Sequence, residues 1–359
     1  MKRRLTVDRK RGAFAASITG TSLVDVLVGL VVALLAIVVV YRAFAALDTL
    51  RRRAADASDA QVAAMFALDT LITQIGNAGA GWFAAAPWLE SCPASADVAT
   101  TLRPVAVLIA DGGAADRPDA IALRQAVAPV GAIGAAFAAA APLGTAFDIE
   151  ASSGFDVGNR IVAVSRTGAC ALAEVTSRTS PAPGVLRVAH TAVTTDFPLS
   201  SVLLDLGPAG SASALRFDVS SGTLRSTDIA NGDAPVPLAT NIVNLKFQYG
   251  VDSDGDGALD TWVPAGTSGP WSAPVLLAAP RTTLARIAAV RVGLIVRSDA
   301  RDPQRSGYDW VLFDCERDDK STCPGRLTGT IAATGAGAYR YRTVETIVPL
   351  PNVVWNAHG

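Results

Sequence analysis

A short acidic loop carries the side chains of this sequence best suited to bind a metal ion. Its carboxylates are Asp252, Asp254, Asp256 and Asp260. Counted from the first aspartate, they occupy positions 1, 3, 5 and 9, and Gly257 at position 6 permits a sharp turn. This spacing matches the first part of an EF-hand-type calcium loop, where alternate carboxylates converge on one hard cation. The backbone carbonyl of Ala258, at position 7, would be a further ligand.

The match to a calcium loop is incomplete. Position 12 is Val263 rather than a bidentate Glu, and strand patterns rather than helix patterns flank the loop. An affinity of about 10⁻⁴–10⁻³ M, as in extracellular modules, is therefore expected. The alternative is a solvated hairpin loop, since Asp-Gly is a strong turn signal. Calcium is the one cofactor that the sequence suggests.

Four cysteines are present, and none forms a CxxC pair. They are Cys92, Cys170, Cys315 and Cys323. The histidines are far from them in the sequence, so the spacing of a zinc site is absent. An even number of cysteines, in a chain with the export signal described below, predicts disulfides in an oxidising compartment. The pair Cys315–Cys323 brackets a short polar loop, which leaves Cys92–Cys170 as the second pair. Four free thiols are the alternative.

The sequence contains no recognisable catalytic set, and we expect no enzymatic activity. Gly-x-Ser-x-Gly, Walker A and GxGxxG motifs are absent. His190 follows an apolar strand pattern and is expected to be half-exposed, while His358 stands in the tail. A formal net charge of -1 provides no global basic field, so direct nucleic-acid binding is not expected.

The N-terminus combines a basic stretch with the densest apolar run of the chain. Residues 1–20 contain six basic side chains and one acid, and the apolar run extends from Leu23 to Val40. About 20 apolar residues can span a bilayer as a helix. The basic flank holds the N-terminus in the cytoplasm and directs the bulk of the chain outside it. Asp25 lies within the run. A charged side chain in a membrane segment is energetically costly, so Asp25 is expected to have a functional role.

Two ordinary interpretations of this segment compete with a more specific one. A secretory signal peptide could be cleaved at Ala43-Phe44-Ala45, but the apolar run exceeds the usual 7–15 residues. A plain signal anchor explains neither Asp25 nor Gly20 before the run. If cleavage follows Gly20, the new amino group of Thr21 could pair with Asp25 of a neighbouring subunit and fix the register of the two helices.

The segment from Gly20 to Leu30 resembles the leader signal of type IV pilins and type II secretion pseudopilins. The resemblance implies that a prepilin peptidase cleaves after Gly20, that Thr21 becomes the methylated N-terminus, and that the apolar run forms the filament core. Two residues depart from the usual pattern. Thr21 stands where the family has Phe, and Asp25 stands where it has Glu, so the carboxylate is shorter by one methylene.

A helical pattern continues past the apolar run. Apolar residues recur at three- and four-residue spacing from Leu47 to Ile75, and Asn77-Ala78-Gly79 is a helix stop. One helix from Thr21 to Ile75 would be roughly 80 Å long. Its first half would lie in lipid or in a filament, and its second half would pack on a globular domain. A coiled-coil stalk is the alternative.

The remainder of the chain is predicted to be mainly strands. Candidates are Ala120–Val127, Arg160–Arg166, Val185–Val193, Leu215–Val219, Ile242–Val251, Ala289–Arg297 and Tyr339–Pro349. Ser221-Gly222 offers a hairpin turn after the fourth of these. Because no regular helices separate the strands, an antiparallel sheet is favoured over a βαβ fold. The Ala-rich stretch from Gly131 to Leu143 is assigned to no element.

Further features resemble PilW-type minor pilins of the type IV pilus. They are Gln74–Gly81 at the helix exit, Asn241–Asp260, Val290–Leu294 and Tyr339–Arg342. The resemblance implies an α+β, pilin-like fold in which a long N-terminal helix packs on a mainly antiparallel β-rich domain. The expected parts are a leader at residues 1–20, the transmembrane and amphipathic helix at 21–77, and a periplasmic globular domain at 78–359.

The same resemblance implies a function. The chain is expected to be a minor pilin that helps initiate pilus assembly, near the filament tip, with indirect roles in twitching motility and cell adhesion. Expected partners are other minor pilins, the major pilin, the prepilin peptidase and the inner membrane, with the protein on the pilus after assembly. The alternatives are a GspJ-like type II secretion pseudopilin and, from another class, a membrane-anchored periplasmic hydrolase.

Overall fold

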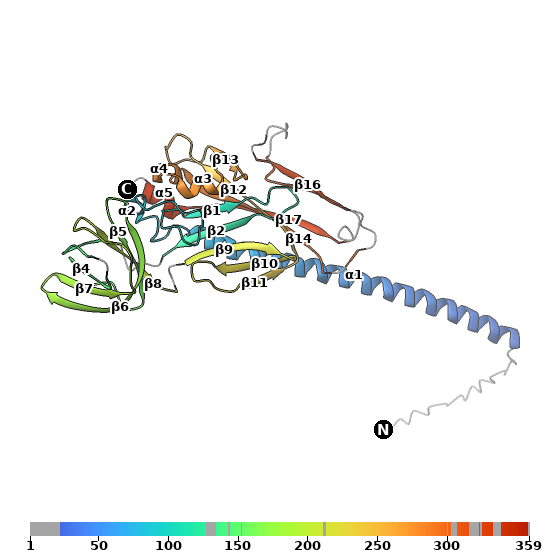
Figure 1. Ribbon diagram of the computed structural model, residues 1–359. Coiled ribbons are helices and arrows are strands. Elements are labelled where there is room, and N and C mark those ends of the chain that lie inside the picture. Colours follow the sequence, from blue (N-terminus) through green and yellow to red (C-terminus); the bar gives the residue numbers. More distant parts are fainter. Residues whose placement is uncertain are drawn as a thin grey trace, which may run out of the picture. The chain divides into compact units, whose positions relative to one another are not determined.

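The computed structural model describes residues 22–126, 134–142, 144–151, 153–210, 213–299, 301–302, 307–315, 323, 325–332 and 339–357 (Figure 1). The chain divides into two compact units, Met1–Ala55 and Asp56–Gly359. The boundary falls inside helix α1, which extends from Leu23 to Asn77. The sequence predicted this helix as Thr21–Ile75, and Thr21 lies outside the described residues.

The part of α1 in the first unit begins with a long apolar stretch. Ser22 precedes the helix and its hydroxyl oxygen accepts a hydrogen bond from the Val24 N–H at 3.3 Å, as an N-cap does. Residues Leu23–Asp48 are long and apolar enough to cross a membrane, and none of their side chains is buried in the protein. The predicted N-terminal apolar helix is confirmed.

The part of α1 in the second unit is amphipathic. Ala64, Ala67, Leu71 and Ile75 repeat at helical spacing and are fully buried in the main core. The helix ends as the sequence predicted, because Gly79 adopts a φ of 82° that favours glycine. The Gly79 N–H then donates to the Arg124 carbonyl oxygen at 2.7 Å, so the exit of the helix is fixed to the neighbouring sheet.

Within the described residues, the second unit also contains four antiparallel sheets. The five-stranded sheet has the order β1 (Val107–Ala110), β2 (Ala120–Gln125), β9 (Ser213–Ser220), β10 (Thr223–Asp228), β11 (Val236–Thr240). The four-stranded sheet has the order β13 (Thr261–Pro264), β12 (Ile242–Val251), β14 (Ile287–Arg297), β17 (Tyr341–Pro349). A two-stranded sheet contains β15 (Tyr308–Leu312) and β16 (Leu327–Ile331).

The fourth sheet has six strands from one continuous stretch of chain. Its order is β3 (Ala135–Ala136), β8 (Val202–Pro208), β5 (Asn159–Val164), β6 (Cys170–Ala182), β7 (Val185–His190), β4 (Ala146–Ile149). The short helices are α2 (Ala86–Leu89), α3 (Ala273–Ala278), α4 (Arg281–Leu284) and α5 (Pro351–Ala357). Every strand pairing within the described residues is antiparallel, which confirms the predicted α+β class with a β-rich domain.

The main core lies between α1 and the five- and four-stranded sheets. Strand β14 is buried on both faces. Val290, Val292 and Leu294 point into the main core, while Ile295 packs in a smaller cluster with Trp310 and Leu312 of β15. Gly293 permits this close approach, since a Cβ there would lie 2.9 Å from Leu312 Cδ1. The β15–β16 hairpin therefore covers the second face of the sheet.

A buried ion pair joins the start of β2 to β12. Lys246 Nζ lies 2.8 Å from Asp119 Oδ1, and both side chains are almost fully buried. Asp119 Oδ2 also accepts the Phe247 N–H at 3.0 Å, and Lys246 Nζ donates to the Ala114 carbonyl oxygen. Burial raises the pKa of Asp119, although Lys246 and two backbone N–H groups oppose the shift. The pair fixes the loop before β2 against the four-stranded sheet.

The six-stranded sheet has a separate core of aromatic rings. The Phe147 ring lies 5.0 Å from Phe137 and 5.7 Å from Phe197, measured between centroids. Along β5, Ile161 and Ala163 face this core, while Val162 and Val164 face a third cluster that includes residues around α2. Because successive side chains of β5 point to opposite faces of the sheet, this strand packs against both cores.

Each strand that the sequence predicted overlaps an observed strand. Strand β12 has the predicted bounds, and the predicted hairpin turn joins β9 to β10, with φ of 51° at Ser221 and 75° at Gly222. Part of the unassigned Gly131–Leu143 stretch forms β3, while residues 131–133 and Leu143 lie outside the described residues. The strands that the sequence did not predict include β1, β4, β6, β8, β11, β15 and β16.

Candidate functional sites

The predicted processing site is only partly within the described chain. Gly20 and Thr21 lie outside the described residues. Asp25 is exposed in the first turn of α1, where a negative charge is favoured by the helix dipole. Within the described residues its carboxylate forms no ion pair. The role of Asp25 in setting the register of neighbouring helices remains a prediction.

The acidic loop connects β12 to β13, and Asp252 organises it. This side chain is buried, and its two carboxylate oxygens accept the N–H groups of Gly255 at 2.6 Å and Gly257 at 2.8 Å. Although desolvation opposes ionisation, these backbone donors hold the pKa of Asp252 below its usual value. Across the loop, Asp260 Oδ2 accepts the Ser253 N–H at 2.6 Å.

Three of the four predicted carboxylates converge. One oxygen each from Asp252, Asp254 and Asp260 lie within 4.8 Å of one another, a spacing compatible with ligands around one calcium ion. Asp256 is not part of this group, and its Oδ1 accepts the Ala258 N–H at 2.7 Å. Calcium binding, and the roles of Asp256 and of the Ala258 carbonyl in it, remain predictions.

The cysteines are paired as the sequence suggested. Cys92 is joined to Cys170, with 5.5 Å between their Cα atoms, and Cys315 is joined to Cys323. Cys92 follows α2 and is fully buried, while Cys170 begins β6. The first disulfide therefore attaches the segment that follows α1 to the six-stranded sheet. The second closes the loop between β15 and β16.

The expectation for His190 is wrong. Its side chain is buried rather than half-exposed, and its ring stacks on Phe147 at 3.9 Å between centroids. Nδ1 lies 2.7 Å from the Thr191 carbonyl oxygen, and Nε2 has no hydrogen-bond partner within the described residues. Burial lowers the pKa of His190. The neighbouring strand β4, which the sequence did not predict, brings Phe147 over the ring.

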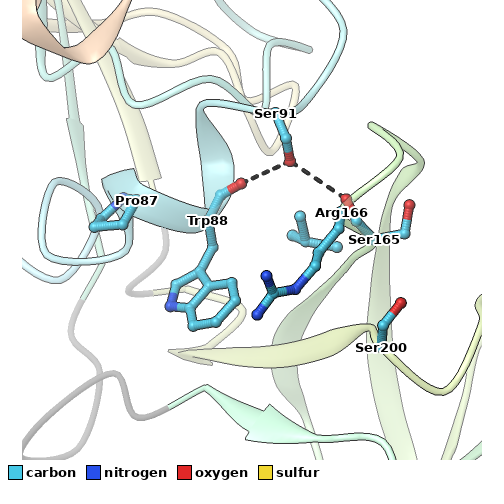
Figure 2. A pocket seen from close by; sticks show the side chains of 7 residues that line it. Pro87, Trp88, Ser91, Ser165, Arg166 and Ser200 are labelled. Atoms are coloured by element: carbon cyan, nitrogen blue, oxygen red, sulfur yellow. Dashed lines mark hydrogen bonds between the residues drawn. The ribbon is translucent and has the colours of Figure 1, made fainter.

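A pocket that the sequence did not predict lies between α2 and the end of β5 (Figure 2). It has a volume of about 380 Å³ and is lined by Pro87, Trp88, Ser91, Val164, Ser165, Arg166 and Ser200. Figure 2 shows the Trp88 indole and the Arg166 guanidinium extending into the same space. Ser91 Oγ donates to the Trp88 carbonyl oxygen at 2.9 Å. The lining residues include no carboxylate, histidine or cysteine, so they offer no ordinary general base.

Comparison with known proteins relates one part of this chain to pilus assembly. Residues 212–352 match the family model of Type IV Pilus-assembly protein W. This region contains strands β9 to β17, the acidic loop and the second disulfide. Its relation to type IV pilus-assembly proteins confirms the resemblance to PilW-type pilins over the matched residues. The match covers less than half of the chain.

Among solved structures, the chain is similar to "Type IV-like pilin TTHA1219 from Thermus thermophilus" at 12% sequence identity and a TM-score of 0.22. The similarity covers 55% of this chain and 86% of the other. A TM-score at this level is too low to carry an argument about the fold. No curated protein matches the chain.

Proposed function

We propose, from the relation of residues 212–352 to type IV pilus-assembly protein W, that this chain is a minor pilin. The family match carries the proposal, and α1 supports it. A helix whose first part is apolar and fully exposed, and whose second part enters the core of a β-rich unit, suits a subunit anchored in a membrane and later in a filament.

The anchor is released from its leader by a prepilin peptidase that cleaves between Gly20 and Thr21. The freed amino group of Thr21, methylated in the mature chain, pairs with Asp25 of a neighbouring subunit. This pairing is supported by the exposed position of Asp25 in the first turn of α1. An ion pair in an apolar environment is tolerated when both charges are matched. It would set the axial register of two adjacent helices.

The role of the protein is structural. Before assembly it is a single-pass inner-membrane protein with its second unit in the periplasm, and after assembly it lies in the pilus near the tip. Its partners are other minor pilins and the major pilin, with which it helps to initiate the filament.

Processing of the full-length chain tests this proposal. Expressed in membranes with a prepilin peptidase, the protein should acquire an N-terminus at Thr21, as read by mass spectrometry. Gly20→Trp should remain uncut, whereas the matched control Gly12→Trp, within the same leader, should be cut normally. An N-terminus at Ala46, directly after the A-x-A site, would show that an ordinary signal peptidase acts and would sink the pilin proposal.

Co-purification with partners distinguishes a type IV pilus subunit from a type II secretion pseudopilin. The full-length protein should co-purify with minor pilins when the two are expressed together, and Asp25→Asn should weaken this association more than Asp69→Asn in the second unit. Association with type II secretion pseudopilins alone would instead favour the GspJ-like alternative.

A further inference from the structure

A second pocket separates the five-stranded sheet from the six-stranded sheet. Its volume is about 250 Å³, and the side chains that matter for its chemistry are Trp82, Thr100, Arg124, Arg160 and Ser213. Arg124 lies on β2, Ser213 begins β9, and Arg160 lies on β5. No part of the proposed pilin function uses this pocket.

Arg124 is a buried cation in this pocket. Only 6% of the residue is exposed, and its guanidinium lies 4.2 Å from the centre of the Trp82 ring. Nη1 donates to the carbonyl oxygens of Val98, at 2.7 Å, and Thr101. Within the described residues, no carboxylate forms an ion pair with it. A buried guanidinium normally has such a partner, because neutral carbonyls compensate only part of the lost hydration.

The donors that Arg124 leaves unused are the ones suited to an oxyanion. Its Nε–H is buried without an acceptor, and Nη2 donates to no described group. Nε and Nη2 form one edge of the guanidinium, which can hold a carboxylate or phosphate through two parallel hydrogen bonds. The hydroxyl of Ser213, in the same pocket, is also buried without a partner in the described structure. Such groups are rare in proteins and call for an explanation.

The charges around the pocket favour an anion. Burial, and next the nearby positive charge of Arg160, lower the pKa of Arg124 to about 10, while Asp228 and Asp97 act in the opposite direction. Both acids are occupied by other hydrogen bonds. Asp97 Oδ1 accepts the Ala99 N–H at 2.9 Å, and Asp228 Oδ2 accepts the Asn231 amide at 2.6 Å. Neither reaches the open edge of Arg124.

We propose that this pocket binds a small oxyanion, a carboxylate or phosphate group, between the Nε–Nη2 edge of Arg124, the Ser213 hydroxyl and Arg160. An anion there would supply the missing acceptor for Arg124 and reduce the repulsion between the two guanidinium groups. It would also connect β2 and β9 to β5, and therefore hold the two sheets together. The volume admits a free anion or the end of a chain, not an extended ligand.

The test measures the thermal unfolding of the full-length protein in detergent, with chelator present to remove divalent metals. Sodium phosphate and sodium acetate are compared with sodium chloride at equal ionic strength. The expected result is a saturable rise of the unfolding temperature with phosphate or acetate, and none with chloride. A short peptide with a free C-terminal carboxylate, compared with its C-terminal amide, distinguishes a chain end from a free anion.

Variants locate the effect in the pocket. Arg124→Lys keeps the charge but loses the two-donor edge, and it should weaken anion binding about tenfold or more, because hydrogen bonds between charged groups are the strong ones. Ser213→Ala and Arg160→Met should weaken it less, and Arg117→Lys, an exposed control in the loop before β2, should not change it. If Arg124→Lys does not fold, the Ser213→Ala and Arg160→Met variants show whether the anion binds in this pocket.

Two results would overturn the inference. One is an equal response to phosphate, acetate and chloride, which would mean that water alone fills the pocket. The other is a saturable response that survives unchanged in Ser213→Ala and Arg160→Met, which would place the anion elsewhere. Neither result affects the processing test at Gly20, so the two proposals fail independently.

Discussion

Two regions of the second unit are built in contrasting ways. The region that matches the pilus-assembly family contributes β9, β10 and β11 to the five-stranded sheet and contains the whole four-stranded sheet. These two sheets share with α1 a core that joins residues far apart in the sequence. The six-stranded sheet comes from the continuous stretch between Ala135 and Pro208 and has its own aromatic core. The family match therefore excludes the six-stranded sheet, which is stabilised mainly by contacts within its own stretch of chain.

The segment that follows α1 is connected to the six-stranded sheet. A third cluster packs Trp82 and Leu89 against Val162 and Leu204 on the second face of the six-stranded sheet. The Cys92–Cys170 disulfide adds a covalent connection at the same place. Because each region has its own core, we predict that substitutions in the six-stranded sheet and in the main core affect different unfolding transitions.

Removing the Cys92–Cys170 disulfide should have the largest effect. The loop it closes spans 78 residues, for which the chain-entropy model gives about 4.5 kcal/mol. The Cys92→Ser, Cys170→Ser double variant should lose about that much stability in urea denaturation of protein from an oxidising compartment. The matching double variant at Cys315 and Cys323 should lose only about 2.5 kcal/mol, since its loop is short.

Mass spectrometry of a non-reduced digest checks the two connections independently of the stability measurements. Free thiols at all four positions in exported protein would contradict the disulfide framework and remove the basis of this prediction.

Core substitutions test whether the two regions unfold separately. Phe147→Ala opens the aromatic core and should destabilise the six-stranded sheet by about 4 kcal/mol. It should produce an early calorimetric transition while the main core stays folded. Leu294→Ala, in β14, should lower the main transition by about 3 kcal/mol.

The exposed Leu199→Ala is the control for these substitutions and should change stability by less than about 0.5 kcal/mol. A single transition that shifts equally for Phe147→Ala and Leu294→Ala would show that the regions form one cooperative unit.

The buried ion pair belongs to the main core, so breaking it should leave the six-stranded sheet unaffected. Asp119→Ala leaves the buried Lys246 ammonium without its carboxylate and should cost about 3 kcal/mol in the main transition. The Asp119→Asn, Lys246→Met double variant should recover part of this loss, because it removes both charges. Asp156→Ala breaks the exposed pair with Arg178 and serves as the control, with less than about 1 kcal/mol expected.

Calcium should have a smaller effect, confined to the β12–β13 loop. At a dissociation constant near 10⁻³ M, a few millimolar calcium should stabilise the protein by about 1 kcal/mol by mass action. Chelator should reverse the shift of the thermal midpoint, and Asp254→Ala should abolish it. Asp256→Ala should have a weaker effect, because Asp256 lies outside the converging group. A shift no larger than that given by magnesium would mean that the loop is only a solvated turn.

Acid pH should act on the six-stranded sheet through His190, with the smallest effect. Burial lowers the pKa of His190 in the folded protein, so below about pH 6.5 the unfolded chain binds more protons than the folded one. The free energy of unfolding should therefore be constant above that pH and fall as the pH drops from 6.5 towards the folded pKa. His190→Gln should flatten the profile between pH 7 and pH 5. An identical slope in both proteins would assign the pH dependence to carboxylates instead.

Local sequence patterns are enough to predict several elements of this protein. The long N-terminal helix, its stop at Gly79, strand β12 and the turn at Ser221-Gly222 follow from nearest neighbours in the chain. The same holds for the Cys315–Cys323 pair and for the carboxylate spacing of the acidic loop, whereas the Cys92–Cys170 pair followed only as the two cysteines left over. Periodicity, glycine torsion angles and cysteine spacing are properties of short segments, so the sequence by itself determines them.

Only the tertiary structure decided which segments meet. It brought Asp252, Asp254 and Asp260 together without Asp256, and it buried His190 under Phe147. It also aligned Arg124 of β2 with Arg160 of β5 and Ser213 of β9 around one pocket. Arg124, Arg160 and Ser213 are far apart in the sequence, and each looks ordinary in its own strand. Whether a polar group is buried, and whether it finds a partner there, depends on long-range packing that no local pattern encodes.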